Sequence, residues 1–244
     1  MAIPRFFCPI PLGPNQTLEL PQELAHHALR VLRLKPESDI LLFDGRGGQY
    51  PAKLVVERKQ GYARIGAHQP TEVELPGEVT LVQGLPSGDK MDWIIEKAVE
   101  LGASRLIPIV AQRSVLQLSG ERATRRMVRW THIAQSASEQ CGRNRIMALS
   151  APRSLQSYLA DANLAGQLAL LCHPEAAHTL AQAVAKSGDQ IVLMVGPEGG
   201  WSDEEQAMAA RKGVIPVKFG DRVLRTETAG LALIAAITAL KHWV

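Results

Sequence analysis

Glycine, arginine and glutamate are concentrated in loops that follow three apolar runs near the carboxyl end of the 244-residue chain. The runs LALLC, IVLMV and VIPVKF continue directly into HPEAA, GPEGG and GDRVLRTETAG. Uninterrupted apolar runs are typical of parallel strands that are buried on both faces of a sheet. Because ligands bind beyond the carboxyl ends of such strands, the sequence predicts that the three loops form one pocket.

The loop GPEGG offers a ligand mainly its backbone. Gly196, Gly199 and Gly200 would let the backbone approach closely and expose N–H and C=O groups, which suit an adenine edge or a ribose. The Gly-Lys-Ser/Thr of a Walker-A loop is absent, and so is the GxGxxG of a dinucleotide site. A tight strand-to-helix turn explains the glycines equally well, because Ser202 and Glu205 have capping-box spacing and predict a helix start.

The loop GDRVLRTETAG crowds polar side chains just before LALIAAITAL, one of the most apolar runs in the chain. A threonine cap, with Glu227 in the first helical turn, would explain Thr226 or Thr228. That interpretation leaves Arg225 unexplained, so a functional role for this loop is favoured.

The elements that position these loops alternate between strand and helix after residue 72. VTLVQGL and RLIPIVA are expected strands, and KMDWIIEKAVELG and residues 121–140 are expected helices. This alternation predicts an α/β domain with a mostly parallel sheet.

The first 70 residues have a different pattern, in which short apolar runs are broken by DGRGG and KQG. Such punctuation predicts a small antiparallel barrel or sandwich. The helix expected in PQELAHHALRVLRL would place Leu24, Ala28, Val31 and Leu32 on one face. HQPTEVELPGE is the best candidate for a linker, so we expect one domain at residues 1–71 and a second at residues 72–244.

The composition excludes several classes of protein. No uncharged apolar run reaches the roughly 18 residues that span a bilayer, and MAIPRFFCPIPLGP lacks the apolar core of a signal peptide. A cytoplasmic location without a membrane partner is therefore expected. Cys8, Cys141 and Cys172 lie far apart in the sequence, so neither a metal site nor a disulfide framework is expected.

The net charge of +3 conceals an uneven distribution along the chain. Residues 1–70 hold nine Lys/Arg against six Asp/Glu, and residues 112–153 hold eight against two. Residues 71–111 sum to −4 and residues 154–244 to −2. The two basic segments indicate contact with a polyanion, although solvated charged faces would have the same composition.

Several motifs together resemble those of one enzyme family. GPEGG with Ser202 and Glu205, then RVLRTETA, preceded by MDWIIEKAVELG, RSV at residues 113–115 and EQCGRNR at residues 139–145, is similar to the RsmE family of ribosomal RNA uridine-N3 methyltransferases. That family belongs to the SPOUT, or α/β-knot, superfamily. HHALRVLRLK and LFDGRGGQY resemble its amino-terminal PUA-like RNA-binding domain, so the resemblance covers nearly the whole chain.

The resemblance implies a fold, a cofactor and a reaction. The carboxyl-terminal segment would form a deep trefoil knot that holds S-adenosylmethionine, and the last helix would lie in a homodimer interface. The substrate would be a uridine of 16S ribosomal RNA, methylated at N3 within the assembled 30S subunit. The residues implied in cofactor binding are Leu171, Cys172, His173, Val195, Gly196, Pro197, Glu198, Gly199, Gly200, Phe219, Gly220, Val223, Leu224, Arg225, Thr226, Thr228 and Ala229.

Methylation of N3 requires that its proton be removed, or that charge spreading onto O2 and O4 be stabilised. We expect Arg225 to stabilise that charge, with Glu198 or Glu227 as the base or as the partner that orients Arg225. Glu198 as a turn residue and Glu227 as a first-turn acid are equally open interpretations.

For contact with RNA we expect arginines, which bind phosphates bidentately and stack on exposed bases. The expected residues are Arg5, Arg30, Arg33, Arg46, Arg113, Arg143 and Arg145. An RNA-binding module without chemistry is one alternative, but GPEGG and RTETA are intact. A nucleotide-binding metabolic enzyme is a second alternative, but it would not explain the basic segments or the first domain.

Overall fold

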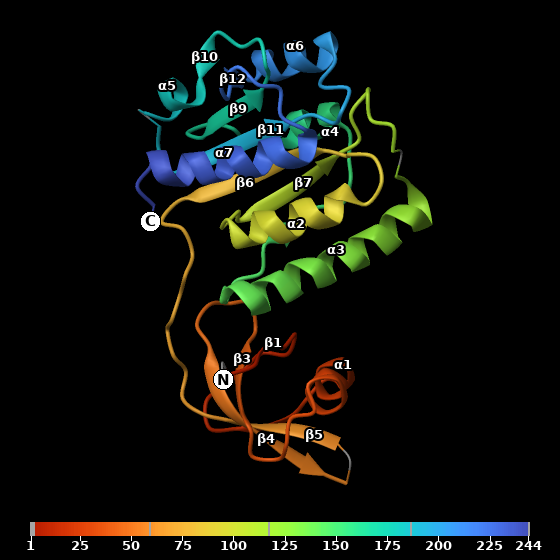
Figure 1. Cartoon of the computed structure of the whole chain (residues 1–244), viewed down its shortest axis with the longest axis vertical. Helices are drawn as coiled ribbons and strands as arrows, with labels where there is room; N and C mark the ends of the chain where they lie inside the picture. The colour runs from red at the N-terminus through yellow and green to blue at the C-terminus, as the bar shows by residue number, and fades with distance from the viewer. Residues whose placement is uncertain (1–2, 59, 117, 186, 244) are drawn as a thin grey trace. The chain divides into compact units, whose positions relative to one another are not determined.

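The computed structural model describes residues 3–58, 60–116, 118–185 and 187–243. The chain divides into two compact units (Figure 1). Unit 1 comprises Met1–Glu74 and Gln135–Ile146, and unit 2 comprises Leu75–Ala134 and Met147–Val244. The end of a long helix and the turn after it therefore belong to unit 1, although they lie far along the sequence from its other residues.

Unit 1 is built on a five-stranded sheet with the order β1-β3-β4-β5-β2. The pair β1 and β3 is parallel, and the other pairs are antiparallel. Alternating residues such as Phe6, Leu42 and Leu54 form its core. The strands are β1 Arg5–Phe7, β2 Thr17–Glu19, β3 Asp39–Phe43, β4 Tyr50–Glu57 and β5 Gln60–Ile65.

The helical segment of unit 1 changes its winding in the middle. Helix α1, Gln22–His26, continues as a π-helical turn, η1, over His27–Val31, in which the Leu32 N–H donates to the carbonyl of His27. Leu24 and Ala28 are buried, but Val31 is 60% exposed and Leu32 45% exposed. The prediction of a single buried face was wrong for the last two, because the wider π turn rotates them away from the core.

Unit 2 is built on a seven-stranded sheet with the order β10-β12-β9-β11-β6-β7-β8, and all of its pairs are parallel. The predicted mostly parallel sheet is thus confirmed. The strands are β6 Glu78–Gly84, β7 Arg105–Ile109, β8 Ala148–Leu149, β9 Leu168–Cys172, β10 His178–Thr179, β11 Gln190–Val195 and β12 Ile215–Lys218.

Helices cover both faces of this sheet. Helices α4 and α6 contribute to a core cluster with Val82, Val192 and Met194, whereas α7 contacts the opposite face, where its Gly230 lies against Leu81. Figure 1 shows α2 beside α7. The helices are α2 Lys90–Glu100, α3 Gly120–Cys141, α4 Leu155–Asp161, α5 Leu180–Val184, α6 Asp203–Arg211 and α7 Thr226–Leu240.

Two properties of the described residues bear on function. None of their helices is long and apolar enough to cross a membrane. No group of three or more His, Cys, Asp or Glu side chains among them could hold a metal ion.

Candidate functional site

A cavity of about 700 Å³ opens in unit 2 at the carboxyl ends of its central strands. The loops after β9, β11 and β12 line it together, since these strands and β6 are consecutive neighbours in the sheet. Of the residues expected to bind a cofactor, all line the cavity except two. Leu171 is buried in the core, and Thr228 is exposed on α7.

The cavity wall includes side chains beyond those expected to bind the cofactor. Some lie in or next to the predicted loops, but Lys90 is the first residue of α2, after β6, and Arg113 lies in the loop after β7. The rule that located the three loops applies to every parallel strand, but only the strand order shows that β6 lies beside β11, with β7 beyond it. The unassigned lining residues are Lys90, Arg113, Pro174, Glu175, Trp201, Asp203, Gln206 and Arg222, of which Arg113 was expected to contact RNA.

The start of α7 is tied to GPEGG by a buried hydroxyl. Thr226 Oγ1 donates to the Gly196 carbonyl at 2.6 Å and accepts from Gln83 Nε2 at 2.9 Å. The N-cap of α7 is Arg225, whose side chain makes no capping hydrogen bond. The interpretation of Thr226 or Thr228 as the cap was therefore wrong, because the Thr226 hydroxyl serves the neighbouring loop instead.

Three donors hold the carboxylate of Glu198. It accepts hydrogen bonds from the Ser87 hydroxyl at 2.7 Å, the Ser87 N–H at 3.1 Å and Lys90 Nζ at 2.8 Å. Burial acts to raise the pKa of Glu198, but the hydrogen bonds from Lys90 and Ser87 outweigh it and lower the pKa from 4.5 to about 2. Glu198 is thus a firmly ionised anchor between GPEGG and the β6–α2 loop.

Glu227 is held more loosely at the same wall. Its Oε2 lies 3.6 Å from Lys90 Nζ, and its side chain is 17% exposed. Within the described part of the chain this buried oxygen has no hydrogen-bond partner. The two carboxylates that the sequence could not distinguish therefore differ in structure: Glu198 is saturated with donors, and Glu227 has an unsatisfied acceptor.

The glycines of GPEGG are needed for the turn itself. A Cβ on Gly199 would lie 2.9 Å from Cβ of Arg113, and one on Gly196 would lie 3.1 Å from Gly200. Gly200 has a φ of +67°, which L side chains rarely adopt. The predicted capping box follows, and it is confirmed, with Ser202 and Glu205 exchanging both hydrogen bonds.

Cys172 lies at the cavity wall without nucleophilic character. Burial raises the pKa of its thiol to about 11. The thiol is therefore neutral at pH 7 and contributes an apolar contact.

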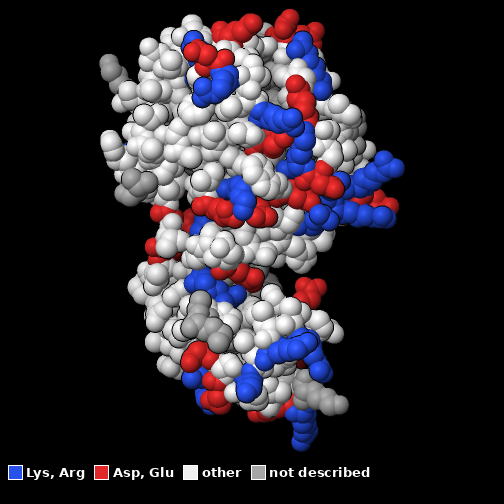
Figure 2. Space-filling model, in the orientation of Figure 1, with Lys and Arg blue, Asp and Glu red and all other residues white. Residues whose placement is uncertain are grey.

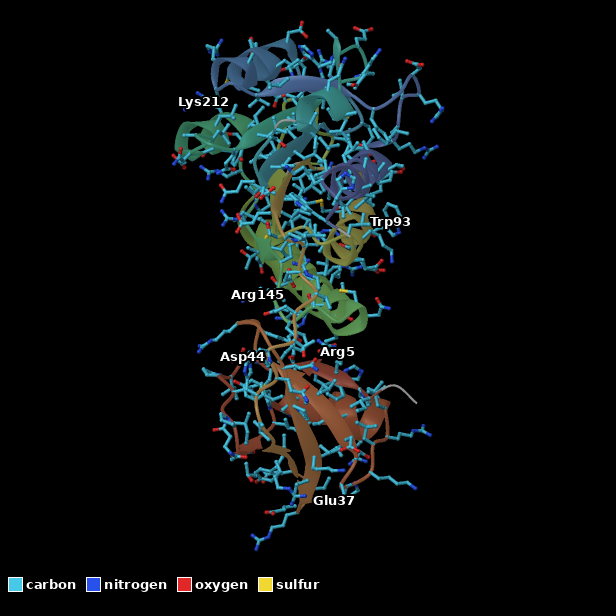
Figure 3. All side chains as sticks on the ribbon, turned by 90° about the vertical axis from the view of Figure 1, so that its left-hand side faces the viewer. Arg5, Glu37, Asp44, Trp93, Arg145 and Lys212 are labelled. Atoms are coloured by element: carbon cyan, nitrogen blue, oxygen red, sulfur yellow. The ribbon has the colours of Figure 1, made fainter. Side chains whose placement is uncertain are left out.

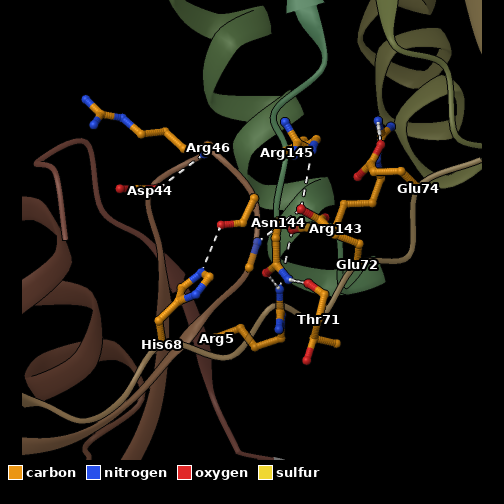
Figure 4. Close-up of polar contacts among 12 residues, drawn as sticks. Arg5, Asp44, Arg46, His68, Thr71, Glu72, Glu74, Arg143, Asn144 and Arg145 are labelled. Carbon is orange, nitrogen blue, oxygen red and sulfur yellow. Dashed lines mark hydrogen bonds and ion pairs between the residues drawn. The ribbon is translucent and has the colours of Figure 1, made fainter. Parts of the chain in front are cut away.

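The arginines expected to contact RNA fall into two groups. Arg30, Arg33, Arg46, Arg113 and Arg145 are exposed. Arg143 is 4% exposed and holds Glu74 through both Nε and Nη2 (Figure 4). Arg5 is half-buried and donates to Asn144 and Gln49. The expectation that Arg143 contacts RNA was wrong, because its guanidinium is buried and paired and is not available to RNA.

The basic segment at residues 112–153 is balanced in space by acids from the preceding segment. Arg126 pairs with Asp89 at 2.8 Å, and Arg129 pairs with Asp92 at 2.6 Å. Figure 2 shows acidic and basic side chains interspersed rather than a continuous basic face. The charge division along the sequence therefore overstated the basic character of this part of α3.

Known proteins resemble the whole chain. Residues 73–238 match the RNA methyltransferase domain family, and residues 20–65 match the RNA methyltransferase PUA domain. Ribosomal RNA small subunit methyltransferase E of Synechocystis is 34% identical over 94% of this chain and 76% of its own length. The corresponding protein of Bacillus subtilis is 30% identical over 91% of this chain and 90% of its own.

Solved structures agree over nearly the full length. Ribosomal RNA small subunit methyltransferase E from Neisseria gonorrhoeae, bound to S-adenosylmethionine, has a TM-score of 0.90 and 38% identity, with 98% of each chain covered. A structure from Legionella pneumophila in complex with the same cofactor has a TM-score of 0.91 and 32% identity, again with 98% of each chain covered. This chain therefore belongs to the family of ribosomal RNA small subunit methyltransferase E, the RsmE family that its motifs resemble.

Proposed function

We propose that this protein transfers a methyl group from S-adenosylmethionine to N3 of a uridine in 16S ribosomal RNA, within the assembled 30S subunit. The observation that carries the proposal is the single cavity formed by the three strand-end loops, in a chain that matches cofactor-bound relatives over 98% of its length.

The cavity suits this cofactor in size and chemistry. Its volume of about 700 Å³ lies in the range of small-molecule sites. Backbone groups of GPEGG and of the loop after β12 would hold the adenosyl part, with apolar contacts from Val195 and Leu224. When bound, this cofactor supplies a methyl group whose departure leaves a neutral thioether.

The protein's own groups would prepare the acceptor nitrogen. The N3–H proton passes to a base, the N3 electron pair forms the bond to the methyl carbon, and the bond from carbon to sulfur breaks. Glu227 fits the role of base better than Glu198, because Glu227 lines the cavity and has one oxygen without a hydrogen bond among the described residues, whereas Glu198 is a weak proton acceptor with three donors. Arg225, exposed at the cavity wall, would stabilise charge on O2 or O4.

Two features of the proposed assembly follow the family resemblance. We propose that the segment through α7 is threaded as a deep trefoil knot; its Thr226 bonds to Gly196 and Gln83, which come from distant parts of the sequence. We also propose a homodimer that covers α7. Ala235 and Ala239 are exposed on this helix, and Trp93, 45% exposed, projects from the adjacent α2 (Figure 3).

We propose that residues 1–71 contact the RNA and that residues 72–244 carry out the methyl transfer. The match of residues 20–65 to a PUA domain supports the first role. A ribosomal substrate would place the protein in the cytoplasm.

Transfer of labelled methyl tests the proposal. Small ribosomal subunits and naked 16S RNA, both from cells that lack this protein, are incubated with labelled S-adenosylmethionine, and the nucleosides are then analysed. We expect 3-methyluridine, formed mainly on the assembled subunit. Binding of the cofactor without label in either RNA would reject the reaction and favour a binding module.

A further inference from the structure

Lys90 joins two loops of the cavity that the sequence keeps far apart. Its ammonium lies 2.8 Å from Glu198 Oε1, in GPEGG, and 3.6 Å from Glu227 Oε2, at the start of α7. Its side chain is 33% exposed and lines the cavity itself. One cation thus pairs with a carboxylate from each loop at the cavity wall.

The two carboxylates depend on Lys90 to different degrees. Glu198 keeps two hydrogen bonds from Ser87 if Lys90 is removed. Glu227 Oε2 has Lys90 as its ion-pair partner and no hydrogen bond within the described part of the chain. Loss of the ammonium would therefore leave Glu227 without the charge that holds it, beside an ionised Glu198 that repels it.

We infer that Lys90 is a positioning residue for methyl transfer, which holds the Glu227 carboxylate in place, while Glu198, itself held by Ser87, holds Lys90. This inference rests on the proposed function. A base must lie within hydrogen-bond reach of the proton that it takes, and small displacements of such groups are costly for the rate. Lys90 acts through Glu227 and does not itself take the proton, because its hydrogen bond to Glu198 raises the pKa of its ammonium.

The test compares Lys90→Met with Lys90→Arg and with Lys97→Met. Lys97 is the matched control, since it lies on the same helix, pairs with Glu96 and Glu100 and does not line the cavity. The rate of methyl transfer, the KM for the RNA substrate, the calorimetric Kd for S-adenosylmethionine and the melting temperature are measured for each variant. The substrate is the RNA or subunit that the unsubstituted protein methylates.

We expect Lys90→Met to lower kcat by about tenfold to 100-fold, with little change in the Kd for S-adenosylmethionine. Lys90→Arg should recover part of the rate, and Lys97→Met should match the unsubstituted protein. In a Glu227→Gln background, Lys90→Met should lower kcat little further, because both changes remove the same function.

Three outcomes would overturn the inference. Lys90→Met could transfer methyl as fast as Lys97→Met, or its lower rate could be fully explained by weaker binding of S-adenosylmethionine. The reductions in kcat caused by Lys90→Met and Glu227→Gln could also multiply in the double variant. Each of these leaves the proposed function intact, because the unsubstituted protein still transfers methyl. Absence of transfer by the unsubstituted protein would instead reject the proposed function, and the inference with it.

Discussion

The hydroxyl of Thr226 donates a 2.6 Å hydrogen bond to the carbonyl of Gly196, which joins the first residue of α7 to the GPEGG loop. The same oxygen accepts from Gln83, a fully buried residue of β6. Three segments that line or support the cavity are therefore connected by one buried hydroxyl. Because a buried polar group that loses its partner carries a large desolvation cost, this hydroxyl links the stability of the fold to the shape of the site.

Replacement of Thr226 by Val should remove the hydrogen bonds that connect these segments, with little change in side-chain volume. We expect the free energy of unfolding to fall by about 1–3 kcal/mol, because the part-buried Gly196 carbonyl loses this donor and the buried Gln83 amide loses this acceptor. Urea denaturation measures this change, and calorimetry should show weaker binding of S-adenosylmethionine. Thr228→Val, at an exposed position on the same helix, is the control. Equal stability of the two variants would contradict the assigned role of the Thr226 hydroxyl.

Glu198 should make the stability depend on pH in the acid range. Its pKa is lowered from 4.5 to about 2 by Lys90 and Ser87, so its ionised form stabilises the folded state. That stabilisation is complete above the unfolded-state value of 4.5 and is lost as the pH falls toward about 2.

The comparison is urea denaturation of the unsubstituted protein and of Glu198→Gln across this range. We expect the substituted protein to be less stable at neutral pH and to lose less of its stability on acidification. Glu57→Gln, at an exposed position in unit 1, controls for the general effect of removing a carboxylate. Parallel pH profiles for the protein and Glu198→Gln would be inconsistent with the hydrogen bonds described.

Arg143 and Glu74 should contribute to stability as a pair. Removing one partner leaves a buried charge, so we expect Arg143→Met to destabilise the protein by about 3–5 kcal/mol. The double variant Arg143→Met, Glu74→Leu should recover much of this loss, because neither charge then remains. Thermal and urea denaturation measure both effects. A double variant no more stable than Arg143→Met would show that the pair is not what holds this turn.

Much of the site could be predicted because its loops follow a general rule of parallel sheets. The runs before HPEAA and GPEGG became β9 and β11, and the cavity lies at their carboxyl ends. Lys90 was missed because its contribution depends on strand order: β6 lies next to β11, although more than 100 residues separate them in sequence. No periodicity in a single sequence encodes that neighbour relationship.

The errors came from tertiary contacts that override local patterns. The 3.6-residue period placed Val31 and Leu32 in the core, but a π turn rotated them into solvent. The segment containing Arg126 and Arg129 has an excess of basic residues in sequence, but in the structure these two arginines pair with Asp89 and Asp92 at the start of α2. Arg143 likewise looked like a surface charge, because no local pattern indicates that Glu74 is its partner.

Arg46 is an exposed arginine of unit 1, in a loop that hydrogen bonds hold in place. Its N–H donates to Asp44, and the following Gly48 N–H donates to Glu72, which also pairs with Arg145 (Figure 4). Gly45, Gly47 and Gly48 all have positive φ, so the loop has a defined path that other residues would strain. A fixed loop with an exposed guanidinium is suited to bind a phosphate.

Replacement of Arg46 by Ala should therefore weaken binding to naked 16S ribosomal RNA and reduce the slope of log K against log salt by about 1, the effect of losing one phosphate contact. Fluorescence anisotropy across a salt series measures both quantities. Arg64→Ala is the matched control, because Arg64 is exposed in the same unit but is paired with Glu37. If Arg46→Ala and Arg64→Ala reduce affinity equally, the DGRGG loop is not a specific phosphate contact and the effect is one of net charge. A loss of affinity confined to Arg46→Ala, with unchanged melting temperature, would assign this loop to the RNA-binding surface.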